Sequence, residues 1–165
     1  MKKLNKKPFN AGVVAKKIDV ESIYNQMRQL IARRNSLQEK QQNLWKVIGR
    51  NHCDRREEMA KITNEIGQCT HKLNGLINKL CQYRKTHKAM KLACQYLNGE
   101  ITRINKIINH QANTVNQVER GRWGLIDSSG RSHTDTTNLR NYIKIKKEQV
   151  AKLQQWKQVV QKYAA

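Results

Sequence analysis

The residues of this sequence best suited to binding chemistry are Lys and Arg side chains clustered near the middle of the chain. They repeat at about helical spacing, and no acidic residue occurs from position 66 through 99. The cluster consists of Lys79, Arg84, Lys85, Lys88 and Lys91. Such cations would contact the phosphates of a nucleic acid, which positions a protein without selecting bases. The alternative interpretation is an ordinary solvated helix face.

A second candidate site combines an aromatic side chain with two arginines. Trp123 lies beside Arg120 and Arg122 in the one stretch without helical periodicity. An aromatic ring on a loop between arginines could stack on an unpaired base; packing against helix ends is the competing interpretation. The predicted nucleic-acid site is completed by basic residues at the start of the chain and near its end: Lys2, Lys3, Lys6, Lys7, Lys144 and Lys147.

Other chemistries find little support in the residue types. Four Cys and five His show no CxxC or paired HxxxH spacing, so no metal site is predicted. No P-loop, dinucleotide fingerprint or catalytic triad is recognisable, and the twelve Asp and Glu are too thinly spread for paired carboxylates. We therefore predict no enzymatic activity and no cofactor.

The charge balance predicts a polyanionic partner. The chain has 33 Lys and Arg against 12 Asp and Glu, a net charge of +21 that would repel itself in a compact state. Nucleic acid, an anionic membrane surface and an acidic protein are the candidates. No stretch approaches the roughly 20 apolar residues of a membrane span, and no signal peptide is evident. We expect a cytoplasmic, nucleoid or nuclear protein with reduced thiols and no membrane association.

The element that precedes the basic cluster is predicted to be a helix over residues 19–48, after a flexible basic arm over residues 1–18. Asp19 can cap the helix. Its apolar residues alternate at spacings of four and three, which is typical of a coiled-coil seam, with Arg34 and Gln41 at two polar steps. The seam consists of Ile23, Met27, Leu30, Leu37, Leu44 and Ile48.

The next helix is predicted from the longest apolar pattern in the chain. Apolar and aromatic residues alternate at three and four from Met59 to Val118, and the phase is kept across Asn98 and Gly99. This favours one helix over residues 55–118, roughly 95 Å long, although Gly99 weakens it by about 1 kcal/mol. The alternative is a break at residues 98–99.

The remaining segment predicts a small β-hairpin or compact loop near residues 120–135 and a last helix over residues 136–163. The turn signal is Asp127 through Gly130. The predicted fold is therefore all-α: a long antiparallel coiled coil or helical bundle, with residues 19–165 as one helical domain. The helix lengths suggest that both outer helices fold back on the central one. The basic cluster, joined by Lys157 and Lys162, would then lie at the centre of a long rod.

These observations predict a basic, helical nucleic-acid-binding accessory protein that contacts mainly the phosphate backbone, of the kind that assists a DNA replication or transfer machine. One alternative is a coiled-coil interaction scaffold or adaptor, whose seams recruit a protein partner or a second copy of the chain. Another is a ribosome-associated RNA-binding protein. The sequence leaves open DNA versus RNA and single versus double strands.

Overall fold

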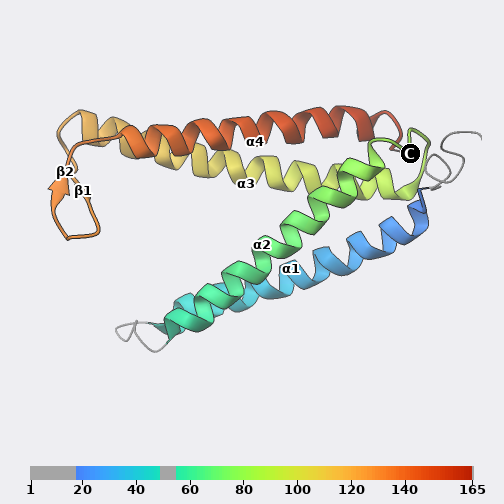
Figure 1. Ribbon diagram of the computed structural model, residues 1–165, viewed down its shortest axis with the longest axis horizontal. Coiled ribbons are helices and arrows are strands. Elements are labelled where there is room, and N and C mark those ends of the chain that lie inside the picture. Colours follow the sequence, from blue (N-terminus) through green and yellow to red (C-terminus); the bar gives the residue numbers. More distant parts are fainter. Residues whose placement is uncertain (1–17, 49–54, 165) are drawn as a thin grey trace, which may run out of the picture. The chain divides into compact units, whose positions relative to one another are not determined.

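The computed structural model describes residues 18–48 and 55–164, which form four helices and a small two-stranded antiparallel sheet (Figure 1). The predicted all-α, helix-dominated fold is confirmed. The basic arm predicted for residues 1–18 lies, apart from its last residue, outside the described part of the chain. In chain order the elements are α1 (Val20–Ile48), α2 (Arg56–Leu80), α3 (Lys88–Glu119), β1 (Leu125–Ile126), β2 (Ser132–His133) and α4 (Thr137–Gln161).

The chain divides into two compact units, residues 1–83 and 84–165, where the sequence predicted one helical domain. In the first unit α1 packs antiparallel against α2, and we call this pair the first hairpin. In the second unit α3 packs antiparallel against α4, and we call this pair the second hairpin. Each hairpin thus joins helices that are neighbours in sequence.

The first hairpin buries four of the six residues of the predicted apolar seam, whereas Leu30 is only partly buried and the burial of Ile48 lies outside what the structure describes. Its first helix begins as expected, because the Ser22 N–H donates a hydrogen bond to the Asp19 carboxylate at 3.1 Å. Polar contacts fix the pairing of the helices: Gln41 Nε2 donates to Thr63 Oγ1 at 3.1 Å. The buried apolar residues are Ile23, Met27, Leu37 and Leu44 of α1, and Cys69, Leu73, Leu76, Ile77 and Leu80 of α2.

The helix predicted over residues 55–118 is in fact two helices. The break lies between Leu80 and Lys88, whereas α3 runs without interruption through Gly99, so the alternative break at residues 98–99 is also wrong. The connection contains Arg84 at φ +48°, and extended His87 caps α3 by accepting the Ala89 N–H on Nδ1 at 3.0 Å.

The apolar pattern could not reveal this break, because it records only which face of a helix is apolar. The seven residues between α2 and α3 restore the same phase, so the alternation continues from Leu80 to Met90 as if no connection intervened. The predicted single rod with the basic cluster at its centre required one continuous central helix, so that arrangement is not supported. The cost of about 1 kcal/mol for Gly99 is tolerated inside a helix of 32 residues.

The second hairpin buries a continuous seam of small and branched side chains. A fully buried Leu, Ile or Met contributes about 1.5 to 3 kcal/mol relative to its exposed state, so this seam is the main source of stability for the unit. The buried apolar residues are Ala89, Met90, Ala93, Leu97, Ile104, Ile108, Val115 and Val118 of α3, and Val150, Leu153 and Val160 of α4.

The link between α3 and α4 is the predicted β-hairpin. Leu125 pairs with His133 and Ile126 with Ser132. The turn closes where expected, since the Gly130 N–H donates to the Asp127 carbonyl at 3.0 Å and Gly130 has φ +82°. Glycine is needed there because a side chain strains a backbone with positive φ.

Candidate nucleic-acid interface

Part of the predicted basic cluster gathers at one end of the second hairpin. Lys88 and Lys91 are exposed on the first turns of α3, and α4 returns antiparallel so that its last turns lie at the same end (Figure 1). Lys157 is close enough to Cys94 for its charge to lower the pKa of that thiol, although burial raises this pKa overall. We call this site the basic end: Arg84, Lys85, Lys88, Lys91, Lys157 and Lys162.

The direction of α3 strengthens the positive potential at the basic end. The first N–H groups of a helix carry a partial positive charge, and α3 has no acidic residue in its first turn to offset it. Lys88 and Lys91 therefore lie where the interaction of a positive charge with the helix dipole is destabilising by about 0.3 to 1 kcal/mol. An anion bound there would relieve this repulsion.

Acidic residues of the same unit are held in structural contacts away from the basic end. Buried Glu100 accepts two hydrogen bonds from Arg103, at 3.1 and 3.0 Å, and these bonds raise the pKa of the guanidinium. Glu119 accepts from Arg140 of α4, which lowers the pKa of this carboxyl group, and also from Thr136 Oγ1 at 3.3 Å.

Two more carboxylates stabilise the link and the start of α4. Asp127 Oδ1 accepts the N–H groups of Ser129 and Arg131, both at 2.9 Å. Asp135 Oδ1 accepts the Thr137 N–H at 3.0 Å and the Thr137 hydroxyl at 2.6 Å. These bonds lower the pKa of both carboxyl groups, with the side-chain bonds of Ser129 and Thr137 as the largest causes.

Other predicted site residues lie elsewhere in the molecule. Lys79 is exposed near the end of α2, in the first unit. Arg120 and Arg122 are exposed at the far end of α3, about 48 Å along the helix from Lys88. Lys2, Lys3, Lys6 and Lys7 fall outside the described residues.

Trp123 is only partly packed. Trp123 remains 49% exposed, and its backbone N–H donates to the Gln117 carbonyl at 3.4 Å. Packing against helix ends therefore stays a prediction, as does stacking on a base. An exposed ring beside Arg122 keeps the stacking interpretation open.

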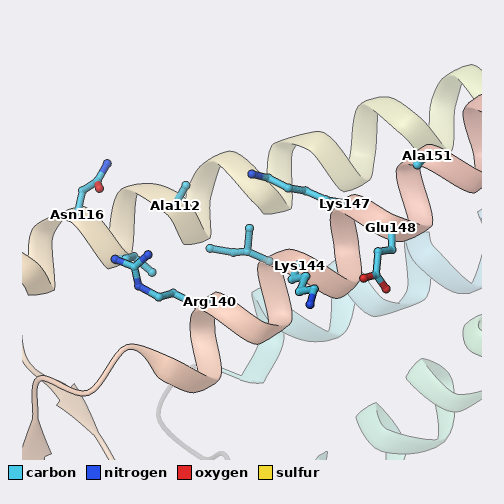
Figure 2. Close-up of a pocket in the computed structure, with 9 residues that line it drawn as sticks. Ala112, Asn116, Arg140, Lys144, Lys147, Glu148 and Ala151 are labelled. Carbon is cyan, nitrogen blue, oxygen red and sulfur yellow. The ribbon is translucent and has the colours of Figure 1, made fainter.

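Lys144 and Lys147 line a groove between α3 and α4 instead of joining the basic end (Figure 2). Lys147 lies ten residues before Lys157, or about 15 Å along α4. Sequence reasoning missed this groove because it depends on small side chains, Ala112 and Ala151, which leave space between the helices. The only signal in the sequence is their small size at positions near the interface.

Two of the described thiols lie in surroundings that favour the protonated form. Burial raises the pKa of Cys81 and of Cys94, which is the opposite of what activates a thiolate nucleophile. Across residues 18–48 and 55–164 no three His, Cys, Asp or Glu side chains are grouped so that they could hold a metal ion.

Of the helices described, none is both long and apolar enough to cross a bilayer. No family model, no curated protein and no solved structure matches this chain.

Proposed function

We propose that this protein binds nucleic acid through the phosphate backbone, with the basic end of the second hairpin as the main contact. One observation carries the proposal. Residues 84–165 contain sixteen Lys and Arg against five Asp and Glu. Glu100 pairs with Arg103 within α3, Glu119 pairs with Arg140 of α4, and Asp127 and Asp135 stabilise the turn and the start of α4. The net positive charge of this unit supports a polyanionic partner.

Nucleic acid suits the basic end better than an anionic membrane does. Binding to a membrane surface needs exposed apolar side chains that enter the interface beside the cations. The large apolar side chains that the described part of the chain leaves exposed are Trp45, Val47, Trp123, Ile126, Tyr142 and Ile145. None of them belongs to the basic end.

The proposed binding does not depend on base sequence. Lysine ammonium groups on helix surfaces pair with phosphates as point charges, and the basic end offers no set of Asn, Gln or Arg side chains arranged to read base edges. Such binding suits a non-enzymatic accessory protein that retains a nucleic acid. A role alongside a DNA replication or transfer machine is the setting that we propose.

The test is binding of the purified, nuclease-treated protein to single-stranded DNA, duplex DNA and structured RNA across about 50 to 300 mM salt. If the six basic-end cations neutralise six phosphates of duplex DNA, the logarithm of the binding constant should fall with the logarithm of the salt concentration with a slope of about −5. The preferred substrate would separate a role on DNA from one on RNA. Absent or salt-independent binding to all three substrates would overturn the proposal.

A further inference from the structure

The groove between α3 and α4 has an apolar floor. It encloses about 580 Å³ and extends along α4 from Arg140 to Ala151, three helical turns or about 16 Å. Its volume is in the range of pockets that hold ligand side chains. The apolar lining residues are Ala112 and Val115 of α3 and Ile143 and Ala151 of α4.

The rim of the groove is mostly cationic. Arg140, Lys144 and Lys147 line it together with one acid, Glu148 (Figure 2). In the close-up the Lys147 side chain extends from α4 toward α3, and Arg140 and Glu148 stand toward opposite ends of the groove. Because Arg140 is paired with Glu119, the positive charge of the rim comes mainly from Lys144 and Lys147.

Charge excludes two occupants that the chain itself could supply. A second copy would bring another unit that contains sixteen basic residues and only five acidic ones, and the two units would repel each other. The segment over residues 1–17 contains six Lys and no acid, so it is repelled by the same rim. Nucleic acid makes less use of this groove, because a phosphate backbone contacts the cations of the rim and leaves the apolar floor uncovered.

We propose that this groove binds an acidic amphipathic helix of another protein. Apolar side chains at positions i, i+3 or i+4, and i+7 of the partner would enter the floor, in the helix-in-groove mode. Its carboxylates would face Lys144 and Lys147, with the more acidic end of the partner away from Glu148. The added helix would lie against both helices of the hairpin and complete a three-helix bundle. This inference does not rest on nucleic-acid binding, because the basic end uses other residues.

The probe is a fluorescein-labelled synthetic helix of about fourteen residues, with Leu at helical spacing on one face and Glu on the other. It is titrated with the full-length protein and followed by fluorescence anisotropy. A peptide of the same composition with a scrambled pattern controls for charge. The patterned peptide is expected to bind at least about tenfold more tightly than the scrambled one, because only it can place its apolar face on the floor. Equal binding of the two peptides, or none, overturns the proposal.

Two double variants locate the binding. Lys144→Glu/Lys147→Glu reverses two charges on the rim, whereas Lys146→Glu/Lys152→Glu reverses two on the same helix outside the groove lining. Both variants have the same net charge. We expect the rim variant to weaken peptide binding about tenfold and the control less than about twofold. Equal losses would mean that binding follows net charge alone and would contradict the proposal.

A third variant fills the groove without disturbing the buried seam. Ala151 is exposed, so Ala151→Trp is expected to keep the thermal stability measured by circular dichroism while abolishing peptide binding. Two results would assign the groove to another occupant and overturn the proposal. One is a dimer in sedimentation that Ala151→Trp dissolves; the other is duplex DNA binding that falls in the rim variant and not in its control.

Discussion

The two hairpins share a plan but distribute charge differently. Each pairs two antiparallel helices around a seam of buried apolar residues. The described residues of the first unit contain ten Lys and Arg against six Asp and Glu, whereas the second unit has sixteen against five. In the first unit the Arg33–Glu65 ion pair, at 3.7 Å, joins the two helices on an exposed face.

This difference indicates that the contacts that stabilise the fold are separate from the charges that concern binding. Apolar seams of similar kind stabilise both units, so stability does not require the charge excess of the second. Excess charge raises self-repulsion and is retained at a cost, which points to a partner that neutralises it. Variants that change packing should therefore act alike on the two units, and variants that change charge should not.

The largest expected effect is on packing. Leu97→Ala in α3 and Leu73→Ala in α2 each remove a side chain with 0% exposure, and each should lower the free energy of unfolding by about 2 to 5 kcal/mol. Hydrogen exchange read by mass spectrometry should show loss of protection confined to the unit that carries the change. Loss spread over both units would show that they unfold as one.

The next effect is on binding. Lys88→Glu/Lys91→Glu at the basic end should lower the affinity for duplex DNA about 100-fold, because two phosphate contacts become repulsive. Lys61→Glu/Lys72→Glu on exposed positions of α2 makes the same change in net charge and should cost only about threefold. Filter binding at fixed salt measures both. Equal losses would show that binding follows net charge and is not localised at the basic end.

A smaller effect is expected from the exposed aromatic residue. Trp123→Ala should weaken binding of single-stranded DNA about fivefold, since a stacked base contributes about 1 to 3 kcal/mol, and leave duplex binding unchanged. Trp45→Ala, at another exposed tryptophan in the first hairpin, is the matched control. A loss common to both substrates would argue against stacking.

Substitution of glycines inside helices tests whether the two hairpins gain the same stability when no charge is changed. A Cβ added at Gly99 in α3 or at Gly75 in α2 meets nothing within 4 Å. Gly99→Ala and Gly75→Ala should therefore each stabilise their unit by about 0.5 to 1 kcal/mol. Urea unfolding measures the gain; a destabilised variant would reveal a close neighbour at that position.

The smallest expected effect is on pH dependence. The contacts of Glu119 with Arg140 and Thr136 lower the pKa of its carboxyl group below the ordinary value of 4.5. These contacts therefore stabilise the second hairpin fully at pH values above 4.5, and this stabilisation is lost as the pH falls through the lowered pKa. Glu119→Gln should melt below the unaltered protein at pH 7, with a difference that narrows toward pH 3. Glu39→Gln in α1 removes the same charge and should shift melting less. A difference independent of pH would contradict the assigned cause.

The sequence predicted most of the secondary structure because the apolar spacing dictates which face of each helix is buried. Both outer helices and most of the seam residues from Ile23 to Val160 follow from that pattern, and the β-hairpin follows from the turn signal at residues 127–130. The break after Leu80 could not be predicted, since it depends on a local cap by His87 and preserves the apolar phase. Arg84, Lys85, Lys88 and Lys91 were singled out from charge alone, and their role as a binding site stays a prediction. The grouping into a basic end and a separate groove needed the pairing of α3 with α4.

Pairing between helices that follow one another along the chain also affects how the protein forms. Contacts of low sequence separation close short loops, so topologies of this kind fold in microseconds to milliseconds. Residues of α1 and α2 can pair while the later part of the chain is still being synthesised, because domains generally fold as units from the N-terminal side. The first hairpin would then be complete before the second hairpin leaves the ribosome, whose own RNA is a polyanion.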